Sequence, residues 1–369
     1  VPRKEYIRHV RRIVVKIGSS LITENNAIST NRISRLVTDI TSLTGEGYQV
    51  VLVSSGAISA GSGAMNRRRD LCTIPQKQAL ASVGQTILMN EYRKCFNWEG
   101  HEVGQILLTE DDVKHRRRFL NARHTLQSLL EMGVIPIVNE NDSVVIKEIK
   151  FGDNDTLSAH VANIIEADLL ILLSDVNGFY WDLDDEGPVE EIHEITEEVK
   201  KRSRGTTSQY GTGGMTTKIA AAEIIMRSGE MMIIANGNEE RVLGRIMNGE
   251  KIGTLFTGSH PTLKSRKRWI AFNVKVKGSI VVDEGAEKAI AHSKKSLLAI
   301  GIAAVKGNFE LGDAVDIINQ SGNVIGRGIV NYNSGELRKI MGKKTAEVRE
   351  ILGATFYDEV INRDDMIIF

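Results

Sequence analysis

The sequence predicts an α/β protein with an open, mostly parallel sheet and helices on both faces, followed by a small β-rich domain. Three observations support this fold class. Short apolar runs recur through the first two-thirds of the 369 residues, amphipathic helical patterns separate them, and the pattern changes near residue 260. Apolar runs without alternation are typical of parallel strands covered on both faces, and the helices between them are the crossovers that such strands need.

The candidate strands of this sheet are the apolar runs Ile13–Ile17, Gln49–Val53, Val103–Leu108, Val134–Val138, Leu169–Leu173 and Met231–Ile234. Between them, two sets of apolar residues repeat at helical spacing. The first set is Ile33, Leu36, Val37, Ile40 and Leu43, and the second is Phe119, Leu126, Leu129 and Leu130. Gly45 and Gly47 can end the first helix, and Gly133 can end the second.

The composition changes at a basic, proline-containing segment, HPTLKSRKRW, at residues 260–269. We therefore expect a first domain at 1–259, a linker at 260–272 and a second domain at 273–369. The second domain contains short alternating runs with glycine turns between them, which predicts strands. These runs are Asn273–Val276, Ser279–Val282, Ala314–Ile318 and Val324–Val330.

The overall composition gives no sign of a nucleic-acid or membrane partner. Lysine plus arginine and aspartate plus glutamate each total 47, so any charged site must be local. Cys72 and Cys95 form no disulfide framework, and no apolar stretch is long enough to span a membrane. No secretory cleavage site follows the basic N-terminus. These features predict a cytoplasmic protein.

Two segments place small polar residues directly after a predicted strand, where ligands bind in open α/β sheets. In VVKIGSSLIT, Lys16 is followed by Gly18, which would let a phosphate approach the backbone. In VVLVSSGAISAG, Ser54 and Ser55 stand where a helix can begin, and free backbone N–H groups there suit an anion. Each segment also has an ordinary interpretation, a lysine that reaches solvent and a serine cap.

A third region is acidic. VNENDSVVI and the following IKFGDNDTLSAHVA contain Asp142, Asp153, Asn154 and Asp155, which we expect in neighbouring loops. Such groups suit a ligand ammonium, a lysine that needs orienting, or a magnesium ion. The alternative is a set of Asx turns with a cap for a helix from Thr156.

A fourth segment, GTGGMTTKIAAAEI, is typical of a loop that binds phosphate and leads into a helix N-terminus. It matches neither a Walker A sequence nor GxGxxG, and a surface loop is the alternative. Upstream, LLILLSDVNGFY ends a strand at Ser174 and Asp175, which predicts a loop on the nucleotide side. Other catalyst classes lack support, because GxSxG, HExxH and CxxC are absent and the histidines, among them His115, His124 and His160, are scattered.

Taken in order, these segments resemble the glutamate 5-kinases of the amino-acid kinase superfamily. The matching segments are VVKIGSSLIT, VSSGAISAG, QKQALASVGQ, QILLTEDD, RFLNARHTL, PIVNENDSV, FGDNDTLSA, LLSDVNGFY and GTGGMTTK. The resemblance runs from about residue 12 to the C-terminal DDMI, while the first ten or so residues match nothing. The tail, with VDEGAEKAI and GNFELGDAVDI, resembles the PUA domain of long bacterial forms.

The resemblance implies a magnesium-requiring transfer of the γ-phosphoryl group of ATP to the γ-carboxylate of L-glutamate, the first step of proline biosynthesis. Lys16 and Lys218 would contact the phosphates, and Asp155 would hold these lysines. Glutamate would be bound by Ser55, Asp142 and Asn154. ATP would be bound by Lys16, Ser174, Asp175, Thr212, Gly213, Gly214, Met215, Thr216, Thr217 and Lys218. No protein metal site is implied, since Mg²⁺ would bind through the ATP phosphates.

The resemblance also implies inhibition by proline and a homo-oligomer, a dimer or tetramer, and it leaves open a transient contact with the next reductase of the pathway. Three alternatives remain: a related kinase acting on carbamate, aspartate or a nucleotide, a non-catalytic amino-acid sensor, and an RNA-binding PUA protein. Residues 273–369 hold 13 basic and 13 acidic residues, a balance that argues against RNA as a partner.

Overall fold

The structure is a computed structural model. It describes residues 2–24, 27–68, 71–114, 116–144, 154–182, 185–203, 214–258, 276–291, 293, 295–353 and 357–369. The chain divides into two compact units, Val1–Pro261 and Thr262–Phe369. The predicted linker at 260–272 lies outside the described residues, so the proposed boundaries of the two domains stay a prediction.

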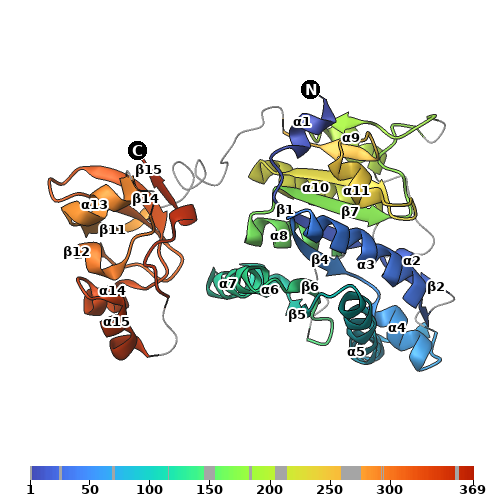
Figure 1. The fold of residues 1–369 in the computed structure, drawn as a ribbon, viewed down its shortest axis with the longest axis horizontal. Helices are drawn as coiled ribbons and strands as arrows, with labels where there is room; N and C mark the ends of the chain where they lie inside the picture. The colour runs from blue at the N-terminus through green and yellow to red at the C-terminus, as the bar shows by residue number, and fades with distance from the viewer. Residues whose placement is uncertain are drawn as a thin grey trace. The chain divides into compact units, whose positions relative to one another are not determined.

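The first unit is built on an eight-stranded sheet in the order β5-β6-β4-β1-β7-β9-β10-β8 (Figure 1). Its strands are β1 (Arg12–Ile17), β4 (Gln49–Ser54), β5 (Val103–Leu108), β6 (Ile135–Glu140), β7 (Leu169–Ser174), β8 (Glu191–Ile192), β9 (Met231–Asn236) and β10 (Thr254–Phe256). From β5 to β9 in this order each strand is parallel to its neighbours, and β10 is antiparallel to β9. The predicted mostly parallel sheet is confirmed.

Helices cover both faces of this sheet. They are α1 (Arg3–Ile7), α2 (Ser19–Ile22), α3 (Thr30–Gly45), α4 (Ala57–Ala64), α5 (Ile74–Trp98), α6 (Glu110–Lys114), α7 (Arg116–Glu131), α8 (Asn154–Ile165), α9 (Glu197–Ser203), α10 (Met215–Ser228) and α11 (Val242–Met247). A short hairpin of β2 (Thr23–Glu24) and β3 (Ala27–Ile28) follows α2. Within the described residues no helix combines the length and the apolar character that a membrane crossing requires.

The alternation of β1 decides which helices its side chains meet. Ile13, Val15 and Ile17 belong to the core on the face covered by α3, α5 and α11, whereas Val14 belongs to the core on the face of α7, α8 and α10. Successive side chains of a strand point to opposite faces. Lys16 therefore shares the face of Val14 and meets α8 and α10.

Two glycines let α4 and α5 pack unusually closely. A Cβ atom added at Gly61 would overlap the backbone of Leu80, and one added at Gly84 would overlap the backbone of Ala57 and Gly61. Only glycine permits backbones to approach in this way. The contact fixes the position of α5, a 25-residue helix that continues across one face of the sheet.

Residues 2–10, which the sequence analysis could not match to the family pattern, pack against the rest of the unit. Ile7 and Val10 are buried in the main core. Arg3 is also buried, and its guanidinium donates hydrogen bonds of 2.6 Å to the carbonyl oxygens of Ile252 and Glu190. The N-terminal helix α1 is thereby tied to backbone at the β8–β10 edge of the sheet.

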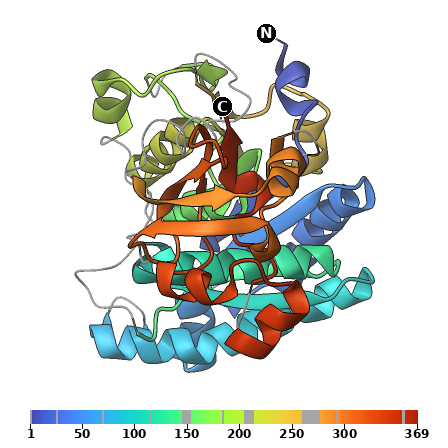
Figure 2. The same ribbon diagram turned by 90° about the vertical axis from the view of Figure 1, so that its left-hand side faces the viewer.

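The second unit has its own core around a five-stranded sheet in the order β12-β11-β13-β14-β15, drawn in orange and red in Figure 2. Its elements are β11 (Val276–Val282), α13 (Glu284–Ala291), η3 (Ala299–Gly301), β12 (Ile302–Gly307), β13 (Ala314–Ile318), β14 (Val324–Ile329), α14 (Ser334–Ile340), α15 (Thr345–Leu352), η4 (Arg363–Asp365) and β15 (Met366–Ile368). A small β-rich domain is therefore confirmed.

One local prediction is wrong. Asn154 and Asp155, expected in a loop, form the first turn of α8. A carboxylate in the first helical turn is favoured by the partial positive charge of the helix N-terminus. Both side chains are buried, and both are thus held by a rigid element rather than by a loop.

Candidate functional site

The polar residues singled out in the sequence gather at one edge of the large sheet. Because β6, β4, β1 and β7 are parallel neighbours, their carboxyl ends lie side by side. β1 is central, with β4 on one side and β7 on the other. This is the arrangement in which open α/β sheets bind ligands.

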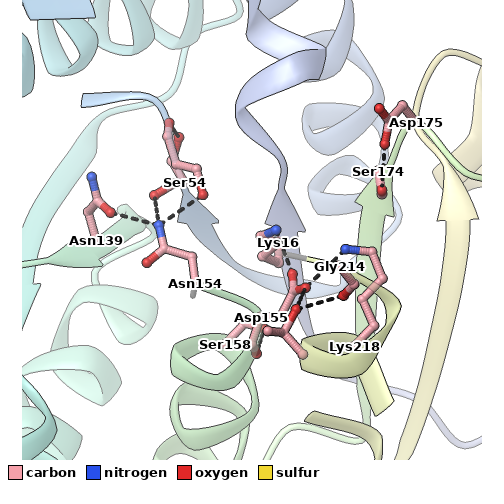
Figure 3. Close-up of polar contacts among 12 residues, drawn as sticks. Lys16, Ser54, Asn139, Asn154, Asp155, Ser158, Ser174, Asp175, Gly214 and Lys218 are labelled. Carbon is pink, nitrogen blue, oxygen red and sulfur yellow. Dashed lines mark hydrogen bonds and ion pairs between the residues drawn. The ribbon is translucent and has the colours of Figure 1, made fainter. Parts of the chain in front are cut away.

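Asp155 stands at the centre of the site, between two lysines (Figure 3). Its Oδ1 lies 2.5 Å from Lys16 Nζ, and its Oδ2 lies 3.0 Å from Lys218 Nζ. Asp155 is fully buried, and Lys16 and Lys218 are only 4 % and 5 % exposed. Thr217 donates a further hydrogen bond of 2.9 Å to Oδ2. Three elements, β1, α8 and α10, thus meet at one carboxylate.

The electrostatics of this cluster keep Asp155 ionised. Burial by itself raises the pKa of the carboxyl, but the charges of Lys16 and Lys218 and their hydrogen bonds outweigh it, so the pKa lies well below its ordinary value. Two ammonium groups share one carboxylate, which leaves a local excess of positive charge. A site of this kind suits an anion.

The start of α10 adds anion-binding groups next to the lysines. Gly214 precedes the helix and, having no side chain, makes no side-chain cap. The Thr217 hydroxyl lies 2.8 Å from Gly214 O and 2.9 Å from Asp155 Oδ2, and its one hydrogen serves these two acceptors, which ties the first turn to the lysine cluster. Backbone N–H groups at a helix N-terminus attract phosphate oxygens.

On the β4 and β6 side, Asn154 organises a second network (Figure 3). Its Nδ2 lies 2.8 Å from Ser54 O, 3.0 Å from Ser55 Oγ and 2.9 Å from Asn139 Oδ1. Asn139, the penultimate residue of β6, in turn donates to Gln85 Oε1 on α5 at 2.8 Å. Ser55 is followed by Gly56, which has a φ of +104°, a value that suits glycine. Gly56 is the N-cap of α4.

On the other side of β1, Ser174 ends β7 and its hydroxyl donates to the exposed Asp175 at 3.1 Å. Gly18, just after β1, lies against this strand end: its backbone N–H donates to Leu173 O at 3.1 Å. A Cβ at Gly18 would lie 4.0 Å from Ser174 Cα. Figure 3 shows Ser174 and Asp175 on the opposite side of Lys16 from Asn154.

The structure brings some of the predicted site residues together and not others. Lys16, Asp155, Thr217 and Lys218 are in contact, as are Ser55 and Asn154. The structure also describes Asp142, Met215 and Thr216. Asp142 lies half-buried in the turn after β6, Met215 packs against the core, and the Thr216 hydroxyl donates to Ser203 O at 3.0 Å. Thr212, Gly213 and Asp153 lie outside the described residues.

Sequence reasoning missed Gln85, Asn139 and the buried Tyr92, whose hydroxyl lies 2.9 Å from Ser54 Oγ. Asn139 could have been found, because it is a polar residue near the end of a buried strand. Gln85 closes the segment QKQALASVGQ, which carries the family resemblance but suggests no role by itself.

The donor set fits a nucleotide phosphate better than a protein-bound metal ion. The part of the chain that the structure describes contains no group of three or more His, Cys, Asp or Glu side chains able to hold a metal. The central carboxylate of Asp155 is already engaged by two ammonium groups.

Comparison with known proteins agrees with this geometry. The amino acid kinase family model matches residues 11–236, and the PUA domain model matches residues 278–352. Glutamate 5-kinase of Thermoanaerobacter sp. (strain X514) is 47% identical over 366 residues, covering 97% of each chain. Glutamate 5-kinase of Geobacter sp. (strain M21) is 45% identical over 371 residues, covering 99% of this chain and 100% of that one.

Among solved structures, the UMP kinase of Bacillus anthracis matches with a TM-score of 0.47 and 15% identity, over 68% of this chain and 97% of that chain. A similarity this low carries no functional inference. The curated relatives, in contrast, align with almost the whole chain at more than 40% identity. The chain therefore belongs to the glutamate 5-kinase family, in the form that joins an amino acid kinase domain to a PUA domain.

Proposed function

We propose that this protein transfers the γ-phosphoryl group of ATP to the side-chain carboxylate of L-glutamate, giving L-glutamyl 5-phosphate, the first step towards proline. The observation that carries the proposal is the cluster of Lys16, Asp155 and Lys218 between two polar strand ends. Family membership supports glutamate as the acceptor, since the aligned relatives are named glutamate 5-kinases.

In this reaction an oxygen of the glutamate carboxylate forms a bond to the γ-phosphorus, the bond to the bridging oxygen breaks, and ADP leaves with the electron pair. The nucleophile is ionised at neutral pH and needs no general base. Catalysis then rests on positioning and on neutralising the charge of the phosphoryl oxygens. Two buried lysines held by Asp155 meet this requirement.

The two sides of the site would hold the two substrates. Ser55, Asp142 and Asn154 would bind glutamate on the β4 and β6 side, where Asn154 already orients Ser55. Ser174, Asp175 and the segment from Thr212 to Lys218 would bind ATP on the β7 side and at the start of α10. Mg²⁺, when bound to the phosphates, would supply further charge neutralisation.

Inhibition by proline, assembly into a dimer or tetramer and a cytoplasmic location complete the proposal. They are supported by the resemblance to the glutamate 5-kinase family.

The proposal is tested by following ADP release with ATP, Mg²⁺ and one acceptor at a time. We expect turnover with L-glutamate and none with L-aspartate, N-acetyl-L-glutamate or carbamate, and we expect proline to suppress it. Turnover with another acceptor and none with glutamate would overturn the substrate assignment. Binding of ATP by a folded protein without turnover on any acceptor would favour a sensor.

A further inference from the structure

Gln85 contacts the glutamate side of the site, yet nothing above gives it a role. Its Oε1 accepts a hydrogen bond of 2.8 Å from Asn139 Nδ2. Its Nε2 is buried and has no hydrogen-bond partner within the described residues. A buried donor without a partner lowers stability, and such groups in native proteins call for an explanation. Gln85 therefore has a feature that stability alone does not account for.

Hydrogen bonds with backbone groups identify the amide oxygen of Asn139 and the amide nitrogen of Asn154. Glu140 N donates to Asn139 Oδ1 at 2.9 Å, so the atom that Asn139 turns towards the backbone must be its oxygen. Its Nδ2 then points to α5 and requires an acceptor, which makes the facing atom of Gln85 the oxygen. The hydrogen bonds of Asn139 therefore determine which amide atom of Gln85 is its nitrogen, and this nitrogen is the one without a partner within the described residues.

The same hydrogen-bond network continues through Asn154 to Ser55, which would contact the substrate. Because Ser54 O and Asn139 Oδ1 are both acceptors, the atom of Asn154 between them is its amide nitrogen. That nitrogen also lies 3.0 Å from Ser55 Oγ, and because it has two hydrogens for three acceptors, this hydrogen bond shares a hydrogen with one of the other two. A hydroxyl that accepts one hydrogen bond can still donate its own proton. Ser55 is thus arranged to donate to an oxygen of an acidic ligand.

Helix packing holds Gln85 in place. It follows Gly84, where the backbones of α4 and α5 touch, and a larger residue there would push α5 away. Tyr92 lies seven residues further on, so it projects from the same side of α5, and its hydroxyl lies 2.9 Å from Ser54 Oγ. The helix therefore contacts the ends of both β4 and β6 through two polar side chains on one face.

We infer that Gln85 is a positioning residue for the acceptor substrate: by accepting from Asn139 it fixes Asn154, and through Asn154 it directs the Ser55 hydroxyl towards a substrate carboxylate. This inference rests on the proposed function. The inference assigns to Gln85, on α5, an effect on the affinity for glutamate without direct contact with glutamate.

The test is Gln85→Met, which keeps the side-chain length and removes the acceptor. We expect the KM for glutamate to rise about 5- to 10-fold, the scale of one lost hydrogen bond, while kcat and the KM for ATP stay within about twofold. The melting temperature should change little, because an unpaired donor on Asn139 replaces the one on Gln85. Gln127→Met, a half-buried glutamine of α7, is the matched control and should leave all three constants unchanged.

A double-mutant cycle with Asn139→Ala separates positioning from a structural effect. If Gln85 acts through Asn139, the double variant has the glutamate KM of Asn139→Ala alone. Additive effects, or equal rises in the KM for glutamate and for ATP, would overturn the inference. If Gln85→Met fails to fold, Gln85→Ala takes its place in the same cycle. Absence of glutamate turnover in the unmodified protein would instead refute the proposed function, so the two failures are distinguishable.

Discussion

The carboxylate of Asp155 lies 2.5 Å from the ammonium nitrogen of Lys16, and both groups are buried. Asp155 belongs to the first turn of α8, and Lys16 is the penultimate residue of the central strand β1. A buried charge is costly unless it is paired. Each residue therefore requires the other, and Lys218 completes the cluster at 3.0 Å from Asp155.

Removing either lysine should slow phosphoryl transfer. For Lys16→Ala and Lys218→Ala we expect kcat to fall about 10²–10⁴-fold, the scale of losing one preorganised charge contact. ADP release by purified variants of normal circular dichroism measures the effect. Lys251→Ala, which removes an exposed lysine paired with Glu190, is the control. Near-normal turnover of a folded Lys218→Ala variant would refute its role.

Asp155→Asn should change how stability depends on pH. The pKa of Asp155 in the folded protein lies below its ordinary value of 3.8, so the ionised carboxylate stabilises the fold at all pH values above that. As the pH falls below 3.8, the unfolded chain takes up a proton that the folded protein does not, and this stabilisation is lost. The wild type should therefore exceed Asp155→Asn in free energy of unfolding above about pH 5, and the difference should shrink below about pH 4.

Urea denaturation of both proteins between pH 3 and 7 would measure this difference. A difference in the free energy of unfolding that does not change with pH would show that Asp155 is not the group that titrates. The same substitution should lower kcat, because the two lysines lose the carboxylate that holds them.

Gly84→Ala should destabilise the first unit. The added methyl group would overlap the backbone of Ala57 and Gly61, and overpacking of this kind costs about 1–3 kcal/mol. Gly45→Ala, at the end of α3 where nothing lies within 4 Å of the added atom, is the matched control and should be neutral or slightly stabilising. Thermal unfolding followed by circular dichroism compares the two. Equal melting temperatures would mean that α4 and α5 can move apart freely.

Glu230→Gln should raise stability at alkaline pH. Burial, followed by the charge of Asp168, raises the pKa of Glu230 well above its ordinary value of 4.5, and Oε2 has no hydrogen-bond partner within the described residues. Between 4.5 and the raised pKa, the folded protein holds a proton that the unfolded chain has released, so stability falls as the pH rises. Glutamine avoids this loss because it stays neutral.

We expect Glu230→Gln to have the higher melting temperature at pH 8 and no advantage at pH 4. Glu131→Gln, an exposed site at the end of α7, controls for the loss of one negative charge. An advantage of Glu230→Gln that is the same at both pH values would point to packing rather than to ionisation.

Much of the fold was accessible from the sequence. The runs at Val103–Leu108 and Ala314–Ile318 became β5 and β13 with the same bounds, because local hydrophobicity suffices to mark a buried strand. Residues at the ends of such strands, among them Ser55 and Ser174, could be placed at the ligand edge for the same reason. The short β8 and the antiparallel β10 left no comparable signal, because two or three residues are too few to show a period.

The contacts of the site depend on tertiary structure. The sequence by itself determined that Lys16 follows apolar strand residues and that Lys218 lies in the first turns of a helix, since both follow from local pattern. Which partners they meet was decided by the face of β1 on which Lys16 projects and by the packing of α8 and α10 over that face. Gln85 joins the site only because two glycines let α5 approach α4, a long-range steric fit that no local pattern encodes.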